Sequence, residues 1–189
     1  ENYSKYRDRP EFQGWFDTFA PNNTWLKPGE MFRCPEMAKT LKEIAATKGE
    51  SFYRGAIAEK IDAFFKKHNG FLTKEDLAAF KPEWVDPISV NYHGVDVWEL
   101  PPNGHGITVL MALQILKDMK LGERDCVDTM HKQIEAMKLA MVDTAQYVAE
   151  PSYMKVSVDQ LLSEKYAAKR RALINDQAIM PEPGEPGFP

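Results

Sequence analysis

The stretch from Ile88 to Met119 reads ISVNYHGVDVWELPPNGHGITVLMALQILKDM, and the rest of the chain is organised around it. In residues 88–92 apolar and polar side chains alternate, and in residues 95–98 valine stands at every second position, which is the period of a β-strand. Between these runs lie His93 and Gly94. A two-residue hairpin turn requires positive φ at both central residues, which glycine adopts freely and histidine tolerates better than most residues. The sequence therefore predicts a β-hairpin over 88–100.

A loop with two prolines and two glycines, Pro101–Gly106, follows the second strand. Proline stops strand pairing, and glycine lets the backbone bend sharply or approach another group closely. Between Ile107 and Leu116 the only polar residues are Thr108 and Gln114. This pattern predicts a helix that is buried on most of its sides.

A glycine-bearing loop at the start of a helix leaves backbone N–H groups free, which favours binding of an anion or an oxyanion. The alternative is a plain connection between strand and helix, in which the glycines serve only the geometry of the turn. On the first interpretation, the loop contributes to a substrate pocket through Pro102, Asn103, Gly104, His105 and Gly106.

The composition is that of a soluble globular protein, with 28% charged and 43% hydrophobic residues among 189. The net charge is -4 and there is no long basic run, so neither a nucleic acid nor an anionic membrane is indicated as a partner. No apolar run approaches the roughly 20 residues that cross a bilayer. The N-terminus lacks the apolar core of a signal peptide, and the compartment stays open between cytoplasmic and periplasmic or secreted.

Metal and redox chemistry are not indicated. Cys34 and Cys126 have no CxxC partner, and we expect both to be buried as small apolar side chains. The histidines show no metal-ligand spacing: His68, His93, His105 and His131. Asp143 could serve a site, lie on a solvated helix face, or form a buried ion pair.

Residues 1–30 lack a helical or strand period and are expected to be irregular. They carry large rings that a polar linker would not have: Phe12, Trp15, Phe16, Phe19 and Trp25. These rings require a surface. Either they wrap over the helices downstream, or they pack on a part of the protein that is absent here.

Residues 31–178 are expected to form a helical domain that includes the hairpin. A first helix begins at Pro35, a second follows Gly55, and a third is capped by Thr73 with Asp76 in the place of the usual Glu or Gln. Inward-facing stripes are expected on the first two: Met37, Ala38, Leu41, Ile44 and Ala45, then Ile57, Ile61, Phe64 and Phe65.

A long helix is predicted over about Asp125–Ala149, with an apolar seam at alternating steps of three and four: Val127, Met130, Ile134, Met137, Met141 and Val148, with Thr144 in the missing place. Ser157 caps a last helical region that is broken near Ser163. Residues 179–189 hold too much proline and glycine for regular structure, and we expect an exposed, mobile connector.

Several segments together resemble the gamma-glutamyltranspeptidase family. In chain order they are PEMAKTLKEIA, FYRGAIAEKI, GFLTKEDLAAF, PISVNYHGVDVWELPPNGHGI and YVAEPSYMKV, within residues 28–172. The resemblance is to the middle and C-terminal part of that family's large subunit. It implies an N-terminal nucleophile hydrolase, a class of enzymes that fold as an αββα sandwich. This chain would contribute an α+β part of that sandwich, predominantly helical and with a β-hairpin. In this family the precursor cuts itself to free a threonine at the start of a small subunit.

The resemblance also implies where the chemistry lies. The nucleophilic threonine would follow Pro189, the arginine that holds the substrate carboxylate would precede Glu1, and the oxyanion elements would belong to the small subunit. No catalytic residue is therefore expected in this chain, which alone would be inactive. The implied partners are the small subunit and a γ-glutamyl or related acyl amide substrate, with no cofactor and no metal.

The loop PPNGHG departs from the typical transpeptidase loop, which has three prolines, two serines and two glycines, and resembles the family's acylase-like branch. Hydrolysis of an acyl amide is therefore favoured over transfer to an acceptor. The alternative function is a non-catalytic helical interaction module that retains the family scaffold. In either case we expect the isolated chain to self-associate through exposed strand edges or apolar patches.

Overall fold

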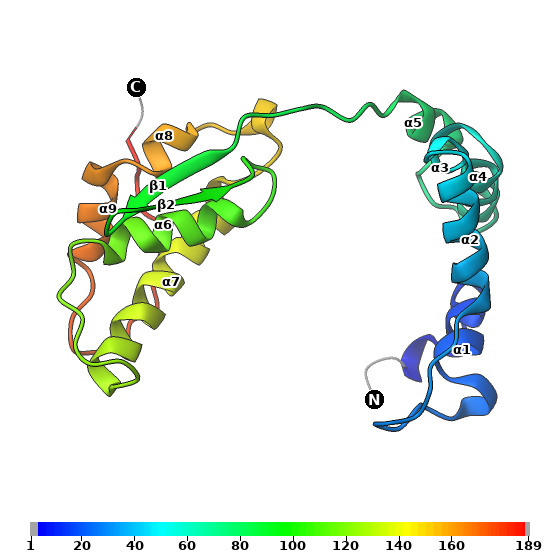
Figure 1. Cartoon of the computed structure of the whole chain (residues 1–189), viewed down its shortest axis with the longest axis horizontal. Coiled ribbons are helices and arrows are strands. Elements are labelled where there is room, and N and C mark those ends of the chain that lie inside the picture. Colours follow the sequence, from blue (N-terminus) through cyan, green and yellow to red (C-terminus); the bar gives the residue numbers. More distant parts are fainter. Residues whose placement is uncertain (1–3, 188–189) are drawn as a thin grey trace. The chain divides into compact units, whose positions relative to one another are not determined.

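The computed structural model describes residues 4–187, which form two compact units within Glu1–Pro82 and Glu83–Pro189 (Figure 1). The ends of the expected N-terminal segment and of the expected connector, residues 1–3 and 188–189, lie outside the described residues. Most elements are helices, and the described residues contain one two-stranded antiparallel sheet, which confirms the predicted fold class. Residues 31–178, expected to form one domain, are divided between the two units. Among residues 4–187, no helix combines the length and apolar character needed to cross a membrane.

The N-terminal segment is more regular than its sequence indicated. Short 3-10 helices η1 (Ser4–Tyr6), η2 (Pro10–Phe12) and η3 (Pro21–Asn23) flank an α-helix, α1 (Gln13–Phe19). The ring centroid of Trp15 lies 5.0 Å from that of Phe16, 5.2 Å from that of Phe19 and 5.7 Å from that of Trp25. The aromatic rings thus supply part of the required surface to one another, and Phe16 is buried.

Four further helices complete the first unit: α2 (Pro35–Ala46), α3 (Glu50–Arg54), α4 (Ala56–Lys67) and α5 (Lys74–Ala79). Helix α3 is a short helix between α2 and α4. The capping box of α5 is confirmed, because the Asp76 amide donates to Thr73 Oγ1 at 3.2 Å and the Thr73 amide donates to Asp76 Oδ2 at 2.9 Å. The buried carboxylate of Asp62 in α4 accepts from Lys66 Nζ and from the Lys74 amide, so it joins α4 to α5.

The prediction that α2 buries an inward-facing stripe is wrong. Helix α2 has no buried side chain, and Met37 and Leu41 are 55% and 57% exposed. Phe64 of α4 is also exposed, whereas Ile57 is buried as expected. The reason is packing within the unit: α3, α4 and α5 contact one another, while α2 contacts α3. The amphipathic pattern of α2 was identified, but most of its apolar face is exposed and only Ile44 is half-buried.

The second unit begins with the hairpin β1 (Ile88–Tyr92) and β2 (Val95–Glu99), paired in antiparallel register with Val90 opposite Val97. The turn is confirmed, since φ is 50° at His93 and 88° at Gly94. The Gly94 amide donates to Asn91 Oδ1 at 3.1 Å, which closes the turn.

Helix α6 (Gly106–Leu116) is the centre of this unit and lies between the hairpin and α7 (Val127–Tyr147) (Figure 1). Most of its residues are buried, as predicted, and its two polar side chains are paired. Thr108 Oγ1 lies 2.8 Å from Thr144 Oγ1, and Gln114 Nε2 donates to the Leu162 carbonyl at 2.8 Å. The largest fully buried apolar side chains lie in this helix and in the elements around it: Ile107, Leu110, Ile115, Leu139 and Leu161.

The unit ends with η4 (Pro151–Tyr153), α8 (Val158–Leu161) and α9 (Glu164–Arg171). The predicted break near Ser163 is confirmed, because Ser157 caps α8 and Ser163 caps α9 through their side-chain oxygens. Both helices contribute to the core around α6: Leu161, Tyr166 and Ala167 are all buried.

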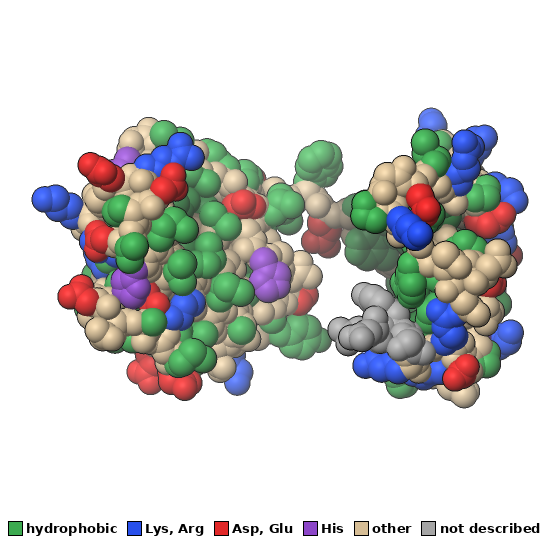
Figure 2. Space-filling view, turned by 90° about the horizontal axis from the view of Figure 1, so that it is seen from below, with side chains coloured by type: hydrophobic (Ala, Val, Ile, Leu, Met, Phe, Trp, Pro, Cys, Tyr) green, Lys and Arg blue, Asp and Glu red, His purple; other side chains and the backbone are tan. Residues whose placement is uncertain are grey.

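The predicted seam of α7 is wrong for its valine, isoleucine and methionine positions from Val127 to Met141, which are exposed, whereas Thr144 in the same seam is buried and Val148 packs against the core. Val127 and Met141 are 87% and 59% exposed, whereas Ala136, Leu139 and Ala140 are fully buried. Alanine lets the backbones of α6 and α7 approach closely, so this narrower face packs on α6 even though the other carries larger apolar residues. Helix α7 thus has two apolar faces, and periodicity did not distinguish them. On the surface of both units, hydrophobic side chains are visible between charged ones (Figure 2).

The C-terminal segment 179–187 forms neither helix nor strand, as its proline and glycine content predicted. It is less exposed than expected, because several of its residues are half-buried and its main chain is hydrogen-bonded to α7, α8 and α9. Buried and half-buried polar side chains on those helices supply the partners that composition alone did not indicate.

Candidate functional site

The loop expected to form a substrate pocket connects β2 to α6. Pro102 is buried and Gly106 is half-buried, so both ends of the loop are fixed against the unit, while Asn103, Gly104 and His105 are exposed. The His105 carbonyl accepts from the Thr108 amide at 3.0 Å, which starts the first turn of α6. The exposed residues Asn103, Gly104 and His105 thus lie directly before α6, the most buried helix of the unit.

Glu99, the last residue of β2, lies close to the start of α6. A Cβ added at Gly106 would lie 2.9 Å from Glu99 Cδ and closer still to Glu99 Oε2, so the carboxylate lies directly against the glycine. The first amides of a helix lack intrahelical partners and attract negative charge. A carboxylate of this chain therefore lies beside the first residue of α6, while Asn103, Gly104 and His105 are exposed.

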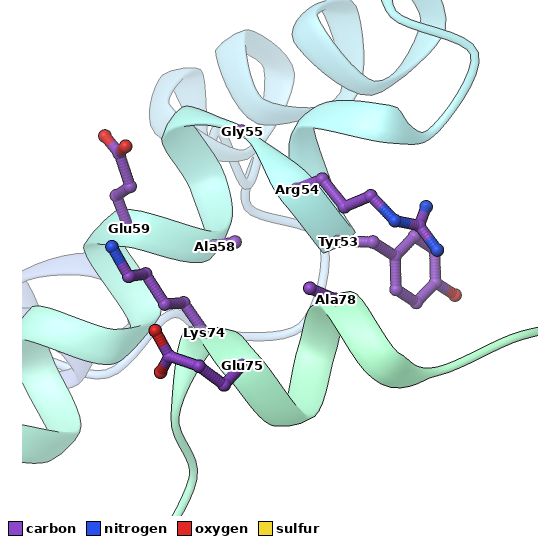
Figure 3. Close-up of a pocket in the computed structure, with 8 residues that line it drawn as sticks. All are labelled: Tyr53, Arg54, Gly55, Ala58, Glu59, Lys74, Glu75 and Ala78. Carbon is purple, nitrogen blue, oxygen red and sulfur yellow. The ribbon is translucent and has the colours of Figure 1, made fainter.

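A pocket that the sequence did not indicate lies in the first unit, with a volume of about 370 Å³ (Figure 3). It lies between α3, α4 and α5, and it is lined by Tyr53, Arg54, Gly55, Ala58, Glu59, Lys74, Glu75 and Ala78. Its small residues leave the space, and its charged residues lie on different elements. Only tertiary packing brings these residues together.

The arginine and the tyrosine at this pocket already have structural partners. The Arg54 guanidinium pairs with Glu50 at 3.2 Å and donates to the Phe80 carbonyl at 3.3 Å. The Tyr53 ring stacks on the Phe80 ring with centroids 5.5 Å apart. These contacts join α3 to the end of α5, so this wall of the pocket is explained by the packing of the unit.

A cluster of buried polar side chains lies where α7, α9 and the C-terminal segment meet. Asp143 is fully buried, and its Oδ2 atom lies 2.9 Å from Arg170 Nε, with Arg170 only 4% exposed. Of the interpretations considered for Asp143, the buried ion pair is confirmed. The Gly184 amide donates to Asp143 Oδ1 at 2.8 Å, so the carboxylate also binds the C-terminal segment.

Burial dominates the electrostatics of this cluster. It raises the pKa of Asp143 above its ordinary value, against the opposing effect of the Gly184 amide, Tyr166 and Arg170. Burial and the neighbouring Asp143 carboxylate raise the pKa of Tyr166. The Tyr166 hydroxyl therefore remains protonated at neutral pH and is available as a hydrogen-bond donor.

Cys126 and His131 make structural contacts. Cys34 and Cys126 are half-buried free thiols, whereas full burial was expected, and Cys126 caps α7 by accepting from the Thr129 amide. His131 Nε2 lies 2.6 Å from the Asn175 carbonyl oxygen. Between residues 4 and 187, no three His, Cys, Asp or Glu side chains are grouped so that they could hold a metal ion.

The amino-acid sequence matches the family model described as gamma-glutamyltranspeptidase over residues 1–187. It is 38% identical over 145 residues to a glutathione hydrolase proenzyme of Escherichia coli (strain K12), covering 75% of this chain and 25% of the relative. It is 31% identical over 168 residues to a glutathione hydrolase-like YwrD proenzyme of Bacillus subtilis (strain 168), covering 88% of this chain and 32% of the relative.

A solved structure similar to this one is the cephalosporin acylase from Bacillus halodurans. The two share 55% sequence identity with a TM-score of 0.87, over 97% of this chain and 35% of the acylase chain. The fold is therefore shared with an acylase, while the proteins it matches in sequence include glutathione hydrolases. The chain spans between a quarter and about a third of the length of these proteins.

Proposed function

Because the chain belongs to the gamma-glutamyltranspeptidase family, we propose that it is the middle and C-terminal part of the large subunit of an enzyme that hydrolyses γ-glutamyl or related acyl amides. The observation that carries this proposal is the family match over residues 1–187, together with the fold shared with a cephalosporin acylase at 55% identity. The names of the two sequence relatives describe proenzymes, which supports a precursor that is processed into subunits.

The proposed reaction uses a threonine at the start of a small subunit, beyond Pro189. Its free α-amino group takes the proton of the hydroxyl while the oxygen attacks the amide carbonyl. The carbon–nitrogen bond breaks, the amine leaves with a proton, and an acyl-threonine ester remains. Water then hydrolyses the ester and restores the hydroxyl. This chemistry requires no cofactor.

In this proposal the chain supplies scaffold and one part of the pocket wall. Asn103, Gly104 and His105 are exposed in a loop whose ends are fixed by buried Pro102 and by Gly106 against Glu99. A loop held in this way can present its polar groups to a substrate with little loss of conformational entropy on binding. We propose that it contacts the acyl group or the leaving amine.

We propose that the enzyme accepts a broader range of acyl groups than γ-glutamyl alone. The loop PPNGHG lacks the serines of the typical transpeptidase loop, and the structure with 55% identity is an acylase. Water is accordingly the proposed acceptor. The proposed partners are the small subunit and the acyl amide substrate.

The test compares this chain with the complete parent protein. We expect the purified 189-residue chain to be inactive toward both a γ-glutamyl anilide and a simple acyl anilide, and the parent protein to release the amine from at least one of them. Release of the amine by the chain alone would contradict a nucleophile that lies beyond Pro189. An inactive parent protein would instead support the alternative of a non-catalytic interaction module.

A further inference from the structure

The most unusual feature of the second unit is the group of buried polar side chains around Gly184. We define the clasp as the side chains of Asp143 and Tyr147 from α7 and of Tyr166 and Arg170 from α9. Asp143, Tyr166 and Arg170 are almost completely buried, and Tyr147 is half-buried. Each lies beside segment 179–187.

Three members of the clasp, Asp143, Tyr147 and Arg170, form hydrogen bonds with the main chain of this segment. The Gly184 amide donates to Asp143 Oδ1 at 2.8 Å, and the Tyr147 hydroxyl donates to the Gly184 carbonyl. Arg170 Nη2 donates to the Glu182 carbonyl at 2.9 Å. Both polar groups of Gly184 are thus paired with α7, and these contacts set the position of the backbone directly.

Two contacts outside the clasp extend this fixation along the segment. The Ile179 amide donates to Glu135 Oε2 at 3.3 Å, and Gln160 Nε2 donates to the Gly187 carbonyl at 2.7 Å. The segment is therefore held near its beginning, at its middle and near its end by three different helices of the unit.

Gly184 is required here for close approach. A Cβ at this position would lie 2.9 Å from both Cδ and Nη1 of Arg170, and nearer still to the Tyr166 hydroxyl. These atoms are the ends of long side chains, but both side chains are buried and cannot move aside into solvent. A larger residue would have to displace the segment or the ion pair.

A buried ion pair is a weak source of stability, because desolvation of the two charges offsets most of their attraction. What this pair does specify is the path of the backbone at 182–184. We propose that the clasp holds segment 179–187 in one position on the C-terminal unit, and so positions the cleavage junction that follows Pro189. The link to cleavage rests on the proposed function, whereas the holding of the segment does not.

The first experiment measures amide hydrogen exchange in the 189-residue chain. Tyr147→Phe removes only the hydroxyl, and Gly184→Ala introduces the steric conflict. We expect either change to accelerate exchange within 180–187 about tenfold, which corresponds to the loss of roughly one hydrogen bond, while amides of α6 stay unchanged. Tyr153→Phe, at a 79% exposed tyrosine, is the matched control and leaves exchange unaltered. Exchange of 180–187 at the rate of an unstructured peptide in the unsubstituted chain would overturn the proposal.

The second experiment follows self-cleavage of the parent protein by intact mass. Because Tyr147→Phe and Gly184→Ala loosen the segment, we expect each to slow self-cleavage about tenfold. The Tyr153→Phe protein should be cleaved at the same rate as the unsubstituted protein. Faster exchange combined with unchanged cleavage would overturn the positioning role. A parent protein that does not cleave would contradict the proposed function and this role with it, while the exchange measurement would still decide whether the segment is held.

Discussion

Leu139 shows at the scale of one residue how the core of the second unit is built. It is fully buried on the face of α7 that packs against α6, between Ala136 and Ala140, which are also fully buried. The small neighbours bring the two helices close, and the leucine fills the remaining space. Met141 is only two positions along the same helix but is 59% exposed, because it lies on the opposite face.

We therefore expect Leu139→Ala to lower the free energy of unfolding by about 2–5 kcal/mol, since it removes buried methyl groups and leaves a cavity. Met141→Ala, on the exposed face of the same helix, is the matched control and should change it by less than about 0.5 kcal/mol. Urea denaturation followed by circular dichroism measures both. A larger loss for Met141→Ala than for Leu139→Ala would mean that the predicted seam is the packed face after all.

Helix α5 illustrates what a local sequence signal can specify at the scale of an element. Thr73 and Asp76 form a reciprocal capping box, and hydrogen bonds from the Thr73 side chain and amide hold the pKa of Asp76 below its ordinary value. A carboxyl whose pKa is depressed by folding adds stability above its unfolded pKa. That contribution disappears as the pH falls through the folded pKa.

Accordingly, Asp76→Asn should destabilise the chain at pH 7. The difference in stability between the variant and the unsubstituted chain should shrink as the pH is lowered below about 4. The comparison requires thermal unfolding of both proteins across that pH range. Asp17→Asn, at a carboxylate exposed in α1, serves as a control for general charge effects. A difference between Asp76→Asn and the unsubstituted chain that stays constant as the pH falls from neutral to well below about 4 would show that the ionised cap contributes nothing.

Elements with a local physical signature were predictable from the sequence, and their packing was less so. The hairpin turn at His93 and Gly94 needs positive φ, the caps at Thr73 and Ser157 need particular side chains, and α6 is apolar on nearly all sides. All of these signals lie within a few residues. The exposed stripe of α2 and the buried face of α7 depend on which element covers which face, and this is a property of the tertiary structure.

The candidate loop was predictable as a connection, but its surroundings were not. Proline and glycine mark residues 101–106 as a turn into a helix. The position of the Glu99 carboxylate against Gly106 depends on how β2 meets the start of α6. Likewise, Asp143 and Tyr147 lie 41 and 37 positions from Gly184 in the sequence, so nothing local distinguishes a held segment from a mobile one.

At the scale of the whole molecule, both units expose apolar side chains on the surfaces of their helices. Val127, Ile134 and Met141 lie along one face of α7 and are each more than half exposed. The hairpin has two strands, and so each strand has one unpaired edge. Exposed apolar faces and free strand edges favour association.

We expect the isolated chain to self-associate, with an average mass in light scattering that rises with concentration. Ile134→Lys and Met141→Lys together place charges on the exposed face of α7 and should reduce this association without lowering the unfolding midpoint. Gln133→Lys is the control, because it adds a charge at an exposed polar residue next to Ile134 and removes no apolar side chain. A mass equal to one chain over the whole concentration range would contradict the expectation.

If this chain is part of a self-processing amide hydrolase, the intact mass of the complete parent protein will reveal the cleavage. We expect two chains, with the smaller one beginning with threonine and the larger one containing residues 1–189. A single uncut chain, with no threonine in the region that follows Pro189, would contradict the proposed function and leave the family scaffold with a binding role.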